Sequence, residues 1–199
     1  NNCPRGIGGI ILSNVIGAKG SRVDNNSIQV DYGENGLTLL SVENMQVKEN
    51  TVSDDGNVNT FTALHAAGGM NLFISCNQLS SQYDNIFSAT GDTHGLRIGN
   101  VVQSVINCNT ISDTERGIRV LGNCSGTQIR GNTLDGHLMG LEYGYNTPLF
   151  DYANTGIQEY NGNQWLSSYA PVQGEFGAKH NDGILYDFSR FIVNDTEGA

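Results

Sequence analysis

An asparagine-centred motif recurs five times along the chain, at intervals suited to one turn of a solenoid. Each copy has an aliphatic residue three positions before the Asn and another two positions after it. The five Asn are Asn26, Asn50, Asn77, Asn109 and Asn132, separated by 24, 27, 32 and 23 residues. Self-similarity at this period indicates a repeat architecture, which constrains the fold more than any other feature of the sequence.

A small residue followed by an aliphatic one forms a second element of the repeat. It occurs at Gly36-Leu37, Ala63-Leu64, Gly95-Leu96, Gly117-Ile118 and Gly140-Leu141, and Arg5-Gly6-Ile7 begins an earlier copy. From this element to the next Asn the distance is 14 or 15 residues, whereas from the Asn to the next small residue it varies from 8 to 18. Each repeat therefore combines a part of constant length with a variable loop.

The repeat predicts an all-β fold, a right-handed parallel β-helix (solenoid) with coils of about 22–32 residues. One such unit cannot bury its apolar face alone, but coils stacked about 4.8 Å apart can. Stacked Asn amides can hydrogen-bond from coil to coil, and Asn tolerates the left-handed bend that turns the chain there. The alternative is a β-sandwich with Asn-rich turns. Three aliphatic ladders are expected: Val23-Val47-Ile74-Ile106-Ile129, Ile28-Val52-Leu79-Ile111-Leu134 and Leu37-Leu64-Leu96-Ile118-Leu141.

Composition excludes several other classes of protein. The 26 Gly and 24 Asn, a quarter of the 199 residues, disfavour a helical bundle. A net charge of -10 argues against a nucleic-acid partner, and no apolar stretch is long enough for a membrane-spanning helix. The chain starts without Met, so we interpret it as a piece of a longer parent protein with flanking domains.

The repeats and the remainder of the chain differ in composition. We assign residues 1–141 to β-helix coils and residues 142–199 to the final coil or coils of the same domain, with long loops or a cap. The second segment holds 11 of the 16 aromatic residues. Within it, 182–184 and 191–194 are expected to form a last coil.

The repeats resemble those of pectate-lyase-like, right-handed parallel β-helix proteins. The resemblance rests on Val47–Val52, Ile106–Ile111 and Ile129–Leu134, and it covers roughly residues 5–141. Segments 156–165 and 189–193 are similar to those that follow such repeats in large secreted surface proteins of Bacteroidota-type bacteria. This resemblance implies export to the cell surface or the extracellular space. It implies no single activity, because the fold hosts lyases, hydrolases, tailspikes, adhesins and inert surface proteins.

Two of the four cysteines fall at the same place in successive repeats. Cys76 and Cys108 each precede the repeat Asn, so stacking places them about one rung apart. That separation suits a disulfide, and a pair of stacked free thiols is the alternative. Cys3 and Cys124 lie about four rungs apart and are not expected to pair.

Two outward columns of the stack gather basic residues beside one sheet. Two residues after each small residue the column is Thr38, His65, Arg97, Arg119 and Glu142, and one residue before it the column is Asn35, Thr62, His94, Arg116 and Met139. Arg forks bind carboxylate or sulfate groups of a polysaccharide. The candidate substrate-binding residues are His65, Arg97, Arg116, Arg119 and Trp165. The alternative is an exposed Arg ladder paired with Glu142, Glu115 and Asp113, which contributes little.

No complete catalytic constellation is present in the sequence. A lyase would need a base, for which Arg97 and Arg119 are candidates, with His94 and Glu142 beside them. It would also need calcium, for which Asp54, Asp55 and Asp92 are candidate ligands; otherwise no cofactor is expected. Trp165 could stack on a sugar or pack a cap.

Three functions remain open at this stage. The first is a non-enzymatic secreted or cell-surface module, acting as a rigid spacer or adhesin that binds a polysaccharide or other surface proteins. The second is a polysaccharide lyase or glycoside hydrolase that acts on an acidic polysaccharide. The third is the subunit of an extracellular filament, in which open coil ends stack on one another.

Overall fold

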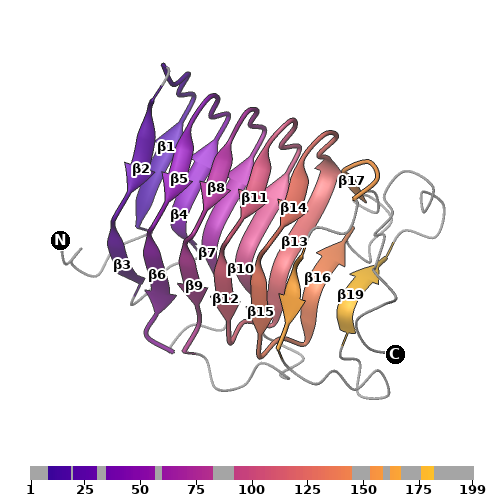
Figure 1. Cartoon of the computed structure of the whole chain (residues 1–199). Coiled ribbons are helices and arrows are strands. Elements are labelled where there is room, and N and C mark those ends of the chain that lie inside the picture. Colours follow the sequence, from indigo (N-terminus) through magenta and orange to yellow (C-terminus); the bar gives the residue numbers. More distant parts are fainter. Residues whose placement is uncertain are drawn as a thin grey trace.

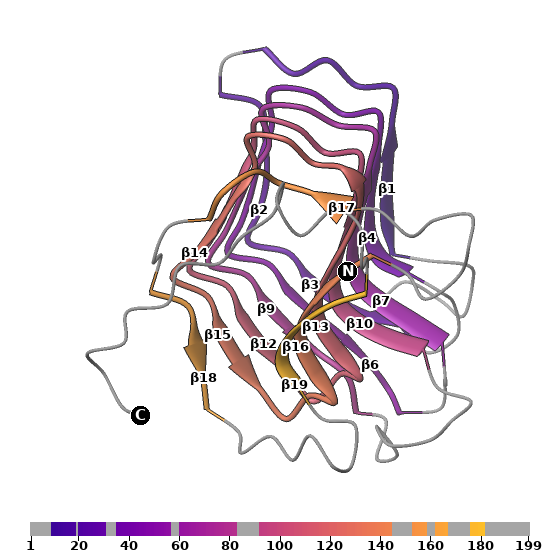
Figure 2. The same cartoon turned by 90° about the vertical axis from the view of Figure 1, so that its right-hand side faces the viewer.

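The computed structural model describes residues 9–18, 20–30, 35–56, 60–82, 92–144, 153–158, 162–166 and 176–181. Within these residues every regular element is a strand, and the strands pair in parallel in three sheets. Successive coils lie side by side along one axis (Figure 1). Viewed along that axis, the chain passes through the three sheets in turn (Figure 2). The chain is therefore a parallel β-helix, as the repeat predicts. A right-handed coil is expected, because crossovers between parallel strands are right-handed in nearly all proteins.

Each of the first five coils contributes one strand to each sheet. Sheet 1 has the order β1 (Ile10–Ser13), β4 (Asn35–Leu40), β7 (Thr60–Ala67), β10 (Asp92–Gly99), β13 (Arg116–Asn123), β16 (Met139–Tyr143) and β19 (Phe176–His180), and β17 (Ala153–Asn154) also pairs with β13. Sheet 2 has the order β14 (Gln128–Arg130), β11 (Val105–Asn107), β8 (Phe73–Ser75), β5 (Gln46–Lys48) and β2 (Arg22–Asp24). Sheet 3 has the order β18 (Gln164–Trp165), β15 (Thr133–Asp135), β12 (Thr110–Ser112), β9 (Gln78–Ser80), β6 (Thr51–Asp54) and β3 (Ser27–Val30).

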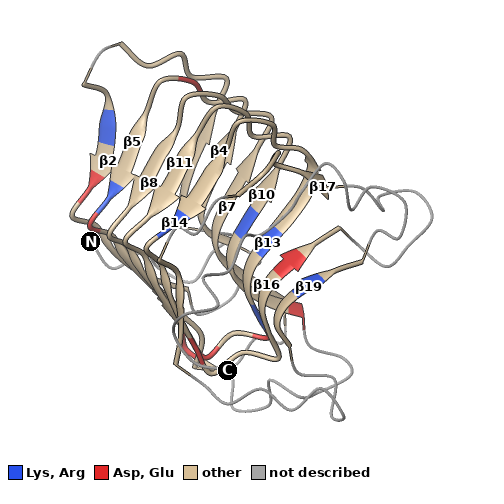
Figure 3. Ribbon diagram, turned by 45° about the vertical axis from the view of Figure 1, so that its right-hand side comes forward, with Lys and Arg blue, Asp and Glu red and all other residues tan. Residues whose placement is uncertain are grey.

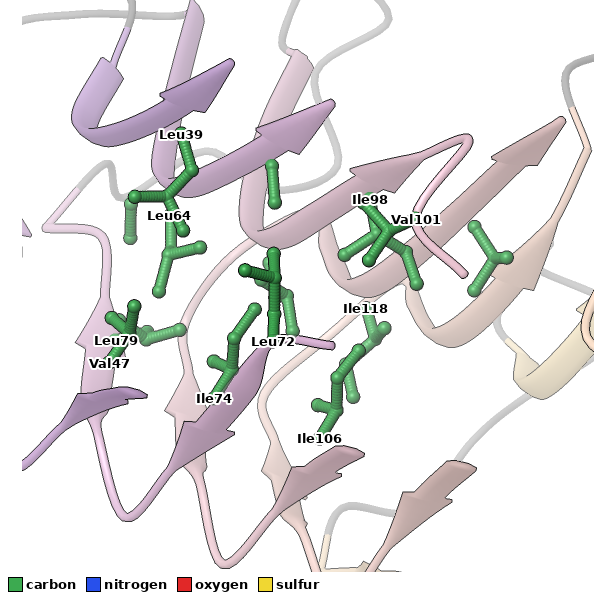
Figure 4. Close-up of a cluster of buried hydrophobic side chains, with 14 of the residues drawn as sticks. Leu39, Val47, Leu64, Leu72, Ile74, Leu79, Ile98, Val101, Ile106 and Ile118 are labelled. Atoms are coloured by element: carbon green, nitrogen blue, oxygen red, sulfur yellow. The ribbon is translucent and has the colours of Figure 1, made fainter. Parts of the chain in front are cut away.

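The three predicted aliphatic ladders form in the predicted register. Ile106 pairs with Ile74 and Ile129 in sheet 2, and Leu96 pairs with Leu64 and Ile118 in sheet 1. Most ladder residues are fully buried, and their side chains fill the space between the sheets (Figure 4). Every coil presents an aliphatic side chain at the same place. The same position is therefore buried in each rung, and the core extends along the axis.

The small residue of each repeat faces the core, where the chain enters sheet 1. A methyl group on Gly95 would clash with Cγ2 of Ile111, and one on Gly36 would clash with Cγ1 of Val52. Both opposing residues are β-branched. In the coil where the small residue is Ala63, the equivalent residue in sheet 3 is Leu79, which carries no methyl on its Cβ. In these three coils the size of the small residue therefore matches the branching of its partner, whereas a methyl group on Gly117 or Gly140 would meet the side chain of His137 or Trp165.

The Asn ladder forms as predicted, but the left-handed bend lies one residue earlier than expected. Nδ2 of Asn77 donates to Oδ1 of Asn109 at 2.9 Å and to the carbonyl oxygen of Val47 at 3.0 Å, and the other Asn repeat this pattern. The residues with positive φ at this turn are Asn25, Glu49, Cys76, Cys108 and Gly131, each of which immediately precedes a ladder Asn. The ladder Asn is needed for its buried side-chain amide. This amide forms hydrogen bonds with backbone groups that would otherwise have no partner at the turn.

The sheets continue beyond the boundary expected at residue 141. That boundary falls inside β16, and β17, β18 and β19 add further strands to the stack. Asn163 extends the Asn ladder by a sixth residue, since its Oδ1 accepts from Nδ2 of Asn132 at 3.0 Å. The last coil expected at 182–184 and 191–194 lies outside the described residues. Among the described residues, no helix has the length and apolar character to cross a membrane.

Candidate functional site

The two columns of polar residues expected beside sheet 1 lie on the outer face of that sheet. The strand register pairs His65 with Arg97, Arg97 with Arg119, and Arg119 with Glu142. Figure 3 shows the charged segments of β10, β13, β16 and β19 lying next to one another. Within β10, Gly95 and Leu96 both face the core, and therefore the residues on either side, His94 and Arg97, face outward together.

Three carboxylates join the arginines in a compact ion-pair network. Nε of Arg116 lies 2.8 Å and Nε of Arg119 lies 3.1 Å from the same oxygen, Oε2 of Glu142. Nη1 of Arg116 also lies 2.8 Å from Oδ1 of Asp92 and 2.9 Å from Oε1 of Glu115. Two arginines of the site therefore face three carboxylates, and the expectation of a basic patch is wrong. Asp113, expected among the carboxylate partners, forms none of the ion pairs found among the described residues.

Most of this network is buried, although the sequence suggested exposed columns. The exposed fraction is 1% for His94, 2% for Arg119 and 3% for Glu142. Buried charges are tolerated only when they are paired and hydrogen-bonded, and these are. Arg119 and His94 are therefore inaccessible to a polymer that lies along the face, which corrects their assignment as surface residues for substrate binding and catalysis.

His94 is held as a neutral acceptor inside the network. Nη1 of Arg119 lies 3.1 Å from Nε2 of His94, and a guanidinium can only donate. The proton of this imidazole therefore resides on Nδ1, which lies 3.5 Å from Oγ1 of Thr62. Burial, reinforced by Arg119 and Arg116, holds the pKa of His94 well below its usual range. His94 thus positions Arg119 and adds no charge of its own.

Among the carboxyl groups of the described residues, Glu115 has the most strongly shifted pKa. Burial raises the pKa of Glu115 to about 7, and this effect exceeds the opposing influence of Arg116. Only Oε1 contacts Arg116, whereas Oε2 is buried with no hydrogen-bond partner among the described residues. A carboxyl of this kind is partly protonated at neutral pH, which is the property of a general acid. The sequence alone predicts Glu115 only as a salt-bridge partner.

His65 and Arg97 form the accessible part of the face. Both side chains are half-buried, and Arg97 has no carboxylate within ion-pair distance among the described residues. Nε of Arg97 is also without a hydrogen-bond partner. Burial and the neighbouring Arg97 lower the pKa of His65, so that this imidazole is neutral at physiological pH. The uncompensated positive charge of the site therefore lies on Arg97.

The three candidate calcium ligands do not converge. Asp54 is fully buried, and its carboxylate accepts from Oγ of Ser81 at 2.7 Å and from the backbone nitrogen of Gln82 at 2.6 Å. Asp55 follows it in the chain, and Asp92 pairs with Arg116 at the start of β10. Within the described ranges, no group of three or more His, Cys, Asp or Glu side chains could hold a metal ion. Asp54 thus closes a turn, and calcium binding stays a prediction from the sequence.

Trp165 belongs to the packing of the last coil. It pairs with Leu134 and occupies the place that an aliphatic residue takes in the earlier coils. Its Nε1 donates to the carbonyl oxygen of Gly177 at 2.6 Å, and its ring packs against the core. The half-buried ring therefore serves the packing of the last coil, as the cap-like alternative describes.

The three described cysteines are free thiols. Cys76 and Cys108 are exposed, whereas Cys124 is fully buried, and burial raises the pKa of Cys124 to about 11. A hydrogen bond between the thiols of Cys76 and Cys108 raises the pKa of Cys76 to about 11. The two thiols are thus adjacent, as predicted, but they lie on the surface. Cys3 lies outside the described residues.

Some members of the site carried little signal in the sequence. Asp92 follows a loop of variable length, so its position relative to Arg116 could not be counted from the repeat. Asn181, whose Nδ2 lies 2.7 Å from Oε1 of Glu142, stands 39 residues from it in the chain. Lys179 extends the column beyond Glu142, and the small residue at Gly177 was the signal that could have located it.

Comparison with known proteins assigns the chain to no family. No protein family and no curated protein matches the chain in sequence. Two solved structures of pectin methylesterase are similar, one a mutant in complex with a hexasaccharide and the other in complex with a second hexasaccharide. Each is 10% identical, the match covers 97% of this chain and 86% of the other, and the TM-scores are 0.38 and 0.37. At these values the likeness carries no information about substrate or activity.

Proposed function

We propose that the chain is a non-enzymatic module of a secreted or cell-surface protein, a rigid spacer that adheres to an acidic glycan through Arg97. The observation that carries the proposal is the division of the arginines: Arg116 and Arg119 are neutralised by carboxylates, and Arg97 is not. A single half-buried guanidinium suits the carboxylate or sulfate group of a polymer. The continuous ladders supply the rigidity of a spacer.

Glu115, which belongs to the ion-pair network of Arg116, makes this adhesion depend on pH. Because burial raises the pKa of Glu115 to about 7, this carboxyl gains a proton as the pH falls from 8 to 6. Each proton gained removes a negative charge from the site, while the carboxylates of the glycan remain ionised. Binding of an acidic glycan should therefore strengthen over this range, and Glu115→Gln should remove the dependence.

A binding assay with a matched charge control tests the adhesive role. Affinity electrophoresis in pectin, alginate and a sulfated polysaccharide would compare the protein with Arg97→Gln and with Arg130→Gln, which removes an equal charge from the exposed end of sheet 2. We expect retardation in at least one gel, and its loss only in Arg97→Gln. Equal weakening by both variants would mean that net charge alone causes the retardation. No retardation in any gel would likewise refute the adhesive role.

A second candidate, a lyase or hydrolase of an acidic polysaccharide, is favoured by one observation. Glu115 combines a raised pKa with a buried oxygen that has no partner, as a general acid at neutral pH would. Viscosity of the same polymers, followed for hours with calcium present, separates the two candidates, because endo-acting enzymes lower it. We expect a constant viscosity. A steady fall that Glu115→Gln abolishes would establish catalysis on sheet 1 and refute the non-enzymatic role. Filament assembly remains a prediction from the sequence.

A further inference from the structure

Cys76 and Cys108 occupy the same turn in two adjacent coils. They follow β8 and β11, whose register pairs Ile74 with Ile106, and the backbone nitrogen of Cys76 donates to the carbonyl oxygen of Asn107 at 3.1 Å. Their φ angles are +52° and +57°, so the two residues share one backbone conformation and their side chains leave the turn in the same direction. Both side chains are exposed, and a hydrogen bond joins the thiols.

The turn itself does not require cysteine. At the same position the neighbouring coils carry Asn25, Glu49 and Gly131, which share the left-handed conformation. Gly and Asn adopt that conformation most readily, whereas cysteine has no such advantage. Two exposed cysteines in consecutive coils are therefore explained neither by the turn nor by burial in the core.

We propose that Cys76 and Cys108 form a thiol–disulfide redox couple, which covalently joins the coil of β7–β9 to the coil of β10–β12 when it is oxidised. Adjacent rungs are about 4.8 Å apart, within the range of about 4.4–6.8 Å between Cα atoms that disulfides span. The cross-link lies on the surface, where closing it displaces no core side chain. The redox couple does not depend on the glycan-binding role proposed above.

The oxidant is a small disulfide such as oxidised glutathione. One thiolate attacks a sulfur of this disulfide, forms a mixed disulfide and releases one glutathione thiolate. The second protein thiol loses its proton and attacks the protein sulfur of the mixed disulfide, which releases the second glutathione. The protein gives up two electrons and two protons, and the oxidant becomes two molecules of glutathione.

Tryptic mapping tests the proposal directly, because each cysteine lies on its own peptide. Cys76 falls on residues 49–97, Cys108 on 98–116, Cys124 on 120–130 and Cys3 on 1–5. After incubation of the folded chain with oxidised glutathione and alkylation, we expect one new species that links 49–97 to 98–116 and separates again on reduction. A link that involves another cysteine, a disulfide between two chains, or separate glutathione adducts on both thiols would overturn the proposal.

Thermal unfolding provides a second readout that a chance cross-link would not share. The bond closes a loop with 31 residues between the two cysteines, and we expect oxidation to raise the unfolding midpoint by about 5–10 °C. A reductant should reverse this shift. Cys76→Ser and Cys108→Ser should each abolish it, whereas Cys124→Ser, which changes a buried thiol in a different turn, should leave it intact. A shift that survives in either of the first two variants would refute the assignment.

Discussion

Gly95→Ala tests the match between this small residue and its partner in sheet 3, Ile111. The added methyl would clash with Cγ2 of Ile111 and lie 2.9 Å from the carbonyl oxygen of Gly117. Ile111 is fully buried, and its Cγ2 is attached directly to Cβ, so no rotation of a flexible chain end relieves the clash. Overpacking of this kind costs about 1–3 kcal/mol, against which Gly→Ala gains about 0.4–1 kcal/mol by restricting the unfolded chain.

The expected net loss for Gly95→Ala is about 1–2 kcal/mol, or a fall of about 3–6 °C in the unfolding midpoint of a chain of this length. Thermal unfolding followed by circular dichroism measures it. Gly99→Ala is the matched control in the same strand, because the nearest atom to its added methyl is Cβ of Leu121 at 3.9 Å. That variant should be neutral or slightly stabilising.

A second substitution that relieves the clash provides the decisive comparison. Ile111→Leu in the Gly95→Ala background recreates the combination of Ala63 and Leu79, which the chain already uses one coil away. We expect the double variant to recover at least about 1 kcal/mol beyond additivity. If Gly95→Ala and Gly99→Ala behave alike, or if Ile111→Leu restores nothing, then branching does not dictate the small residue.

Two further predictions concern stability. Because burial raises the pKa of Glu115 to about 7, above its ordinary value of 4.5, the folded chain retains a proton that the unfolded chain has lost. This contribution to stability is complete below about pH 4.5 and declines by up to about 3 kcal/mol as the pH rises to 7. Urea unfolding at pH 5 and at pH 8 measures the decline, and the difference in unfolding free energy between the two pH values should be smaller in Glu115→Gln. An unchanged difference would contradict the raised pKa. Asn77→Ala should lower stability by about 3 kcal/mol or more, because it leaves the backbone nitrogen of Asn50 and the carbonyl oxygen of Val47 without partners. Asn26→Ala, at the half-exposed start of the ladder, should lower it less, and equal losses in denaturant unfolding would refute a role for burial.

The arrangement of the core could be predicted from the sequence because a solenoid repeats one local environment. Once the Asn and the small residue define the coil, each aliphatic residue falls at a fixed distance from them, and stacking places like residues together. The same reasoning located the column of His65, Arg97 and Arg119. It did not place Trp165 at a ladder position, because it left open whether this residue stacks on a sugar or packs a cap.

The amino-acid sequence by itself determined the fold, the register of the ladders and the adjacency of Cys76 and Cys108. All three follow from spacing, and the spacing of a repeat is written in the chain. The tertiary structure alone decided which polar residues are buried and which carboxylates neutralise which arginines. Asp92 and Glu142 reach Arg116 from β10 and β16, and Glu115 reaches it from the bend just before β13, so side-chain packing rather than spacing determines which atoms meet. The free charge on Arg97 and the raised pKa of Glu115 follow from that packing, and the proposed function depends on both.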